Sequence, residues 1–170
     1  MVPFLDPAMR AAVAELPVLP GRTVVLVDVS GSMDAKISAK SDLNRIDAAA
    51  ALAVMIHGDV QVYTFSNRLV ALDAETSGLS GIRQIVESQP HQGTELGSAV
   101  GSLANLEMDR LIVITDEQSH DHVPEPRAAR AYMINVAAYQ NGVGYGERWT
   151  HLDGFSEQVI RWIHEFEALS

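Results

Sequence analysis

The chain has 170 residues, 47% of them hydrophobic, and its 12 Lys and Arg residues against 22 Asp and Glu residues give a formal net charge of −10. These values predict one folded domain with its own core and exclude a disordered chain. The acidic balance argues against non-specific nucleic-acid binding, and the absence of cysteine excludes disulfides and thiolate metal sites. Because we recognise neither a signal peptide nor an apolar run of about 18 residues, we expect a cytoplasmic protein without a membrane span.

The first 20 residues are interpreted as a lead-in arm, and residues 21–170 as a single domain. Residues 7–16 form the predicted helix of that arm. Residues 23–29, TVVLVDV, form an almost unbroken β-branched run. Such a run is typical of a strand that is covered on both faces in a parallel sheet.

An Ala-rich helix and two strands are predicted next. Residues 46–57 are apolar on most sides, which indicates a well-buried helix, and Asp42 is its expected cap. Residues 60–65, VQVYTF, form the second predicted strand. Residues 68–72 form a short edge strand after a turn.

Two further helices and a buried strand follow. The helices are predicted at residues 79–86 and 95–104, and the Pro- and Gly-containing loop between them includes Thr94. Residues 110–115, RLIVIT, form another strand of the buried kind.

The last part of the chain contains five predicted segments. They are a short helix at 126–131, a strand at 132–138, a Gly-rich loop at 141–146, a strand at 149–152 and a helix at 155–169. The apolar residues that share one face of the last helix are Phe155, Val159, Trp162, Ile163 and Phe166. We expect this face to pack in the core rather than to dock a partner.

Strands that alternate with helices predict an α/β fold: a Rossmann-like three-layer sandwich with a mostly parallel central sheet and one short antiparallel edge strand. In such sheets, ligands bind beyond the carboxyl ends of the strands. The side chains at those ends are therefore the candidates for function.

Oxygen-bearing side chains follow the predicted strands. The first strand runs into DVSGS, where Asp28, Ser30 and Ser32 alternate and can converge. Asp116 follows the strand at 110–115, and Thr94 lies in the loop before a helix. Thr94 and Asp116 are each, taken alone, more typical of a helix cap, whereas DVSGS alone fits a turn and a functional site equally well. Together, three hydroxyls and two carboxylates favour an octahedral cation such as Mg²⁺.

The pattern of DVSGS, Thr94 and the Asp116 of VITDEQS resembles the metal-ion-dependent adhesion site of von Willebrand factor A domains. The resemblance implies Mg²⁺ or Mn²⁺ at the top of the sheet. Ser30, Ser32 and Thr94 would contact the metal directly or through water, whereas Asp28 and Asp116 would act mainly through water. It also implies a protein partner that donates an Asp or Glu carboxylate to the metal.

A narrower resemblance covers residues 19–169. The segments VLVDVSGSM, ITDEQSH, INVAAYQNGVGYG and WTHLDGFSE resemble the C-terminal half of Ro autoantigen (TROVE) proteins. Those proteins also carry a ring of helical repeats that binds small RNAs. We expect no such ring within these 170 residues. The resemblance therefore implies a place in a ribonucleoprotein system without direct nucleic-acid binding by this chain.

An enzyme is the alternative hypothesis. A Mg²⁺-dependent phosphotransfer or phosphatase enzyme would use Asp28 as its nucleophile. That chemistry needs a cation near the phosphoryl oxygens, and both lysines, Lys36 and Lys40, lie in the segment directly after the first strand. We therefore expect a binding module with no catalytic residues; a metal-free structural domain is the third interpretation.

Several polar residues near these positions are weaker candidates. His120 and His122 offer a second metal site or a pH-sensitive rim, but two histidines without a third ligand favour a solvated loop. Asp34 is expected at the surface, whereas Glu117 fits either a surface charge or a position next to the metal ligands. His91 is expected to be exposed or at the rim of the site.

Overall fold

The computed structural model describes residues 16–35, 44–72, 78–116, 122–137, 148–154 and 156–169. Several predictions lie outside these ranges: the lead-in helix up to residue 15, the Asp42 cap, Glu117, His120 and the Gly-rich loop at 141–146. Among the described residues, no helix has the length and apolar character needed to span a bilayer.

One sheet of six strands forms the middle layer, in the order β3-β2-β1-β4-β5-β6. The strands are β1 (Val18–Asp28), β2 (His57–Phe65), β3 (Leu69–Ala71), β4 (Arg110–Thr115), β5 (Arg130–Asn135) and β6 (Thr150–Asp153). All neighbours pair in parallel except β2 and β3, which are antiparallel. The predicted mostly parallel sheet with a short antiparallel edge strand is confirmed.

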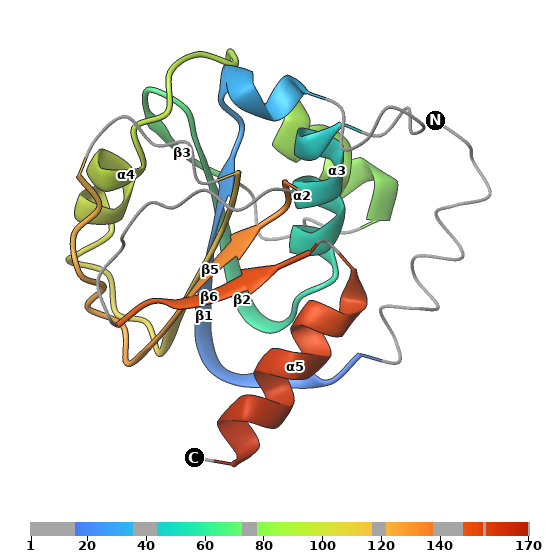
Figure 1. Ribbon diagram of the computed structural model, residues 1–170, viewed down its shortest axis with the longest axis vertical. Coiled ribbons are helices and arrows are strands. Elements are labelled where there is room, and N and C mark those ends of the chain that lie inside the picture. Colours follow the sequence, from blue (N-terminus) through green and yellow to red (C-terminus); the bar gives the residue numbers. More distant parts are fainter. Residues whose placement is uncertain are drawn as a thin grey trace.

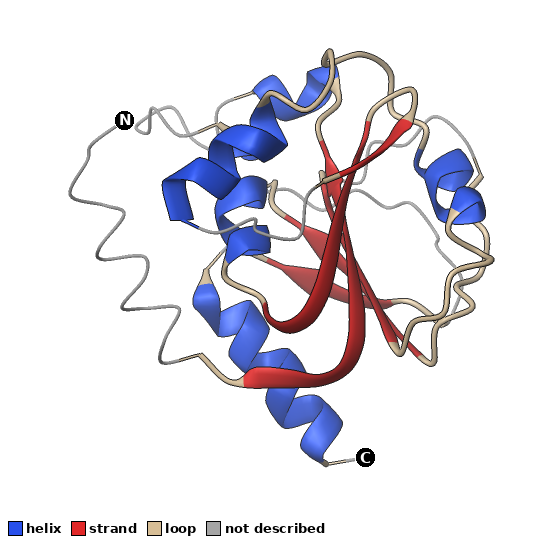
Figure 2. Cartoon of the chain, turned by 180° about the vertical axis from the view of Figure 1, so that it is seen from behind, coloured by secondary structure: helices blue, strands red, loops and turns tan. Residues whose placement is uncertain are grey.

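Helices cover both faces of this sheet. They are α2 (Arg45–Val54), α3 (Gly78–Val86), α4 (Leu96–Ser102) and α5 (Glu157–Ala168), with a short 3₁₀ helix, η1 (Gly31–Asp34). Helices α2, α3 and α5 lie on one face and α4 lies on the other, as Figures 1 and 2 show from opposite sides. The three-layer α/β sandwich is therefore confirmed.

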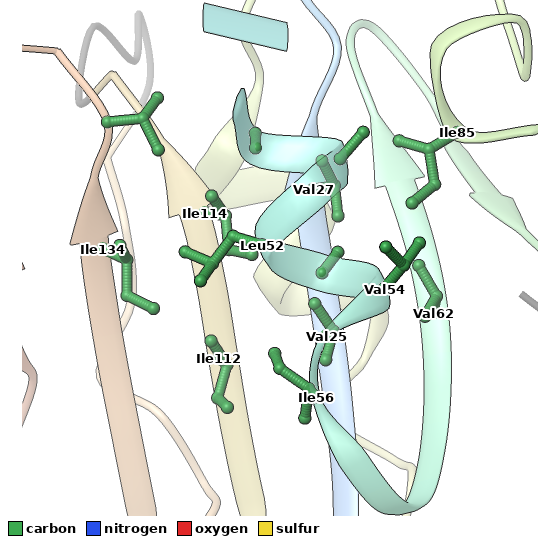
Figure 3. Close-up of a cluster of buried hydrophobic side chains, with 14 of the residues drawn as sticks. Val25, Val27, Leu52, Val54, Ile56, Val62, Ile85, Ile112, Ile114 and Ile134 are labelled. Atoms are coloured by element: carbon green, nitrogen blue, oxygen red, sulfur yellow. The ribbon is translucent and has the colours of Figure 1, made fainter. Parts of the chain in front are cut away.

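The alternation of side chains along β1 supplies both halves of the core. Val25 and Val27 pack into the cluster under α2, α3 and α5, to which Leu52 of α2 also belongs (Figure 3). Val24 and Leu26 pack into the cluster under α4. Because the strand is covered on both faces, an uninterrupted apolar run is the sequence that fits it.

Several predicted boundaries near the start of the domain are wrong. Asn44 caps α2, because its side chain accepts the backbone N–H of Asp47 at 2.9 Å. The helix ends at Val54, and β2 already begins at His57. β1 begins five residues before the predicted strand, so residues 18–20 belong to the sheet rather than to a lead-in arm.

The short helix predicted at 126–131 is also wrong. Arg130 and the residue after it already belong to β5, where Arg130 pairs in register with Arg110 of β4. The predicted strand at 132–138 accordingly begins and ends too late. Pairing with an existing strand overrides the weak local helix preference of this segment, since propensity is only a small contribution to the free energy.

The apolar face of α5 is narrower than predicted. Val159, Ile160 and Ile163 are buried, whereas Trp162 and Phe166 are 41% and 40% exposed. The two exposed rings stack on each other, with centroids 4.8 Å apart and planes 10° apart. The sequence prediction that placed Trp162 and Phe166 in the core is therefore wrong, because the buried face of α5 is centred on Ile160.

Candidate metal centre

The predicted site residues gather where the strand order changes direction. From the central strand β1, the chain continues to β2 on one side and later to β4 on the other. Asp28 is the last residue of β1, and Asp116 comes directly after β4. In open α/β sheets, this switch point at the carboxyl ends of the strands is where ligands bind.

Three hydroxyl groups from two loops meet at this edge. Thr94 Oγ1 donates a hydrogen bond to Ser30 Oγ at 2.8 Å, although 64 residues separate them in the sequence. Ser32 Oγ lies 3.3 Å from Ser30 Oγ. Ser30 and Thr94 are buried, and Ser32 is partly exposed at the surface side of the cluster.

The spacing of these oxygens fits a small octahedral cation. A Mg²⁺ ion with oxygens at about 2.1 Å places neighbouring ligands about 3 Å apart. The two observed separations, 2.8 Å and 3.3 Å, lie on either side of that value. In the described part of the chain, no group of three or more His, Asp or Glu side chains is placed to hold a metal. A metal at this edge would therefore depend on the hydroxyl oxygens of Ser30, Ser32 and Thr94.

Asp28 lies fully buried behind the hydroxyls. Its Oδ1 accepts the backbone N–H of Ser30 at 2.9 Å, and its Oδ2 accepts the hydroxyl of Thr115 at 2.7 Å. Burial raises the pKa of Asp28 to about 6; the negative charge of Asp116 acts in the same direction, and the hydrogen bonds act against it. The two contacts orient the carboxylate, while its burial makes the charged form costly without a cation.

Asp116 completes the set of predicted residues and lies in an ion pair. Its Oδ2 accepts a hydrogen bond from Nη1 of Arg45 at 3.0 Å, and its side chain is fully buried. The same nitrogen reaches the backbone oxygen of Ser32 at 3.4 Å. Arg45 therefore joins the loop after β1 to the end of β4.

Sequence reasoning missed three residues that shape this site: Arg45, Ser66 and Thr115. Thr115 ends β4 and stands beside the end of β1, so its place at a strand end was an available signal. Ser66 follows β2 in the same way. Arg45 has no comparable signal, because its contact with Asp116 spans 71 residues and depends on how α2 lies over the sheet.

Ser66 holds the loop that carries Thr94. Its hydroxyl accepts the N–H of Gln92 at 2.7 Å and donates to the carbonyl of Gly93 at 3.1 Å, and its own carbonyl accepts the N–H of Glu95 at 3.0 Å. These bonds fix the backbone on both sides of Thr94. The hydroxyl of Thr94 is thus positioned by tertiary contacts of its loop, and not by capping a helix.

A second connection joins the Thr94 loop to η1. Nδ1 of His91 lies 3.0 Å from Oδ1 of Asp34, and Nε2 lies 2.8 Å from the carbonyl oxygen of Val86. The backbone N–H of Gly31 also donates to the carbonyl of Gln92 at 2.8 Å. Asp34 is half-exposed, as predicted for a surface position, yet it helps to hold the two hydroxyl-bearing loops together.

Comparisons with known proteins agree on the fold. No family model and no curated protein matches this sequence. The Ro (RSR) protein of Deinococcus radiodurans is similar in structure, with a TM-score of 0.69 and 22% identity over 89% of this chain and 34% of that protein. An aerotolerance-related membrane protein from Bacteroides fragilis, with multiple mutations to serine, has a TM-score of 0.56 and 14% identity over 85% of this chain and 96% of that one. This chain thus spans about a third of the Ro protein, and the predicted resemblance is confirmed at the level of the fold.

Proposed function

We propose that this chain is a divalent-metal-binding module for protein interaction. Ser30, Ser32 and Thr94 would bind Mg²⁺ or Mn²⁺ through their hydroxyls, and Asp28 and Asp116 would act mainly through water. A carboxylate of a partner protein would complete the coordination. The observation that carries the proposal is the meeting of three hydroxyl oxygens from distant loops at spacings of 2.8 Å and 3.3 Å.

The chemistry of these ligands favours an anionic partner. Hydroxyl ligands are neutral, so they leave most of the positive charge on the bound ion. A carboxylate from a partner then adds a strong, charge-assisted contact, while the surrounding loops supply the rest of the interface. The cluster lies at the edge of the sheet, outside the pocket of about 200 Å³ that Val100, Leu103, Leu111 and other residues line beside α4.

The phosphotransfer alternative receives mixed support. Arg45 brings a cation to the cluster, which the position of the lysines had not offered. However, Asp28 is fully buried, and both of its oxygens already accept hydrogen bonds. A nucleophilic carboxylate needs an oxygen that can approach the phosphorus atom, so Asp28 is poorly placed for attack. A binding role therefore remains our proposal, and a link to a ribonucleoprotein system rests on the Ro resemblance alone.

Thermal unfolding with and without metal tests the proposal. A ligand that binds only the folded state at 100 times its Kd stabilises by about 2.7 kcal/mol. For a chain of this length, that corresponds to a rise in Tm on the order of 5–10 °C. We expect Mg²⁺ or Mn²⁺ to produce this rise over a sample in EDTA, and Ser30→Ala to abolish it.

Ser102→Ala is the matched control. Ser102 is exposed on α4 and donates to the carbonyl of Ser98 at 2.9 Å, so this variant removes a serine hydroxyl away from the cluster. It should keep the full response to metal. A Tm that does not move at millimolar Mg²⁺ and Mn²⁺, or a response that survives Ser30→Ala, would contradict the proposed site. Turnover of an acyl phosphate that depends on Asp28 would favour the enzyme instead.

A further inference from the structure

Arg45 places a positive charge beside a site proposed for a doubly charged cation. Its Nη1 lies 3.0 Å from Oδ2 of Asp116, with side chains 13% and 0% exposed, respectively. Its contact to the carbonyl of Ser32, at 3.4 Å, brings the same group to the hydroxyl-bearing loop. Asp116 thus already has a cationic partner from within the chain.

The local position of Arg45 does not favour a cation. Arg45 is the first residue of α2, where the helix dipole and the backbone N–H groups create positive potential. Asn44 caps this helix end through its side-chain oxygen, and a guanidinium, which only donates hydrogen bonds, has no capping role there. The backbone N–H of Arg45 donates to the carbonyl of Ala35 at 2.9 Å, which ties this end of α2 to the residue after η1. The charge therefore has its stabilising partner in tertiary contact, at Asp116.

Two cations cannot share Asp116 without repelling each other. A divalent ion bound near Asp116 interacts unfavourably with the guanidinium, and this repulsion is only weakly screened between groups that are largely buried. In the absence of the ion, the guanidinium offsets part of the negative charge of Asp116. Removing it would take this compensation away from the buried Asp116 carboxylate, which itself lies close enough to act on Asp28.

We infer that Arg45 is a built-in counter-ion of the metal site, which neutralises Asp116 when the metal is absent and lowers the affinity of the site for divalent ions. The inference rests on the proposed function, because it concerns the same site. Metal binding then weakens the Arg45–Asp116 pair and places the guanidinium in a different environment. The affinity of the site is accordingly set by this competition as well as by the ligands.

The test measures Mn²⁺ and Mg²⁺ binding to the whole chain by calorimetry, with Mn²⁺ also followed by electron paramagnetic resonance. Arg45→Met keeps much of the aliphatic stem and removes the charge, so we expect its Kd for metal to be about one tenth of the wild-type Kd or lower. We also expect this variant to be less stable than the wild type in EDTA and to regain that stability at saturating metal. Arg45→Lys should bind nearly as the wild type does. Arg161→Met is the matched control, because Arg161 is partly exposed and its partner Glu157 lies 4.0 Å away on the same helix. It should leave the Kd unchanged.

The outcomes separate this inference from the proposed function. If the wild type binds metal through Ser30 but Arg45→Met binds equally or more weakly, the counter-ion is refuted and the metal site stands. If neither the wild type nor Arg45→Met binds metal, both ideas are wrong. If Arg45→Met fails to fold, a measurement on the wild-type protein decides whether Arg45 is the counter-ion. The side-chain NMR signal of Arg45, assigned by its loss in Arg45→Lys, should shift on titration with Mg²⁺, and an unchanged signal at saturation would overturn the inference.

Discussion

Replacing Asp28 by Asn should stabilise the metal-free protein at neutral pH while removing its response to metal. The carboxylate is fully buried at the end of β1, between the N–H of Ser30 and the hydroxyl of Thr115. An amide has nearly the same shape. Its oxygen can accept from Ser30, and its NH₂ group can donate to the Thr115 oxygen once that hydroxyl turns. The substitution therefore removes the charge with little loss of packing.

The magnitude follows from the raised pKa. Burial moves the pKa of Asp28 from 3.8 to about 6, and each unit corresponds to about 1.4 kcal/mol. A raised pKa means that the folded state holds its proton more tightly than the unfolded chain does. The resulting stabilisation is complete below pH 3.8 and is lost as the pH rises through about 6, so the ionised group costs about 3 kcal/mol. Asp28→Asn has no carboxyl group to ionise, so it does not lose this stability as the pH rises. It should be more stable than the wild type by up to about 3 kcal/mol at pH 8 and by almost nothing near pH 4.

Urea unfolding followed by circular dichroism in EDTA, from pH 4 to pH 8, measures this difference. Asp59→Asn is the control, because Asp59 is exposed and its substitution should change stability by less than about 0.5 kcal/mol across the range. Added Mg²⁺ should restore stability to the wild type and leave Asp28→Asn unchanged. If Asp28→Asn is less stable than the wild type at pH 8 in EDTA, or if its advantage does not grow with pH, the reasoning from burial is refuted.

Two further substitutions test the far end of the sheet. Glu167→Ala should lower the free energy of unfolding by about 3–5 kcal/mol in urea, because it removes the carboxylate that pairs with the buried guanidinium of Arg110 and accepts the hydroxyl of Tyr132 at 2.7 Å. Gly58→Ala should cost about 2 kcal/mol or more in the same assay, because φ is +131° and an added Cβ would stand 2.7 Å from the carbonyl oxygen of Leu19.

Each of these two substitutions has a matched control elsewhere in the chain. Glu157→Ala removes a carboxylate from a partly exposed pair on α5 and should change stability by less than about 0.5 kcal/mol. Gly101→Ala lies in α4, where an added Cβ meets nothing within 4 Å, and should be neutral or stabilising by up to about 1 kcal/mol. A mild effect of Glu167→Ala, or equal effects at Gly58 and Gly101, would contradict these accounts of burial and backbone geometry.

The contacts of Glu167 with Arg110 and Tyr132 also make the stability of the protein depend on pH. Burial acts to raise the pKa of Glu167, but hydrogen bonds and charge from Arg110, with the hydroxyl of Tyr132, lower it overall. A lowered pKa gives stability that is present above the usual value for a glutamate and is lost as the pH falls. The wild type should therefore lose stability on acidification relative to Glu167→Gln, which is the opposite of the trend at Asp28.

The strands were predictable because each carries its signal locally. The run from Val24 to Val27 is apolar at every position, which indicates a strand covered on both faces, and the structure confirms it. The hydroxyl and carboxylate residues that follow β1 and β4 were predictable for the same reason. The ends of β1 and β4 are recognisable in the sequence because polar residues follow an apolar run, and parallel strands bring those ends to one edge.

What tertiary structure alone decided was which distant groups meet. The 2.8 Å contact between Thr94 and Ser30 depends on Ser66 holding the loop, and the pairing of Arg45 with Asp116 depends on how α2 crosses the sheet. Trp162 lies exposed on α5 although its spacing fits an apolar face. Local sequence reports periodicity and the nature of each side chain, whereas the packing of helices over the sheet determines which faces are covered and which charges become neighbours.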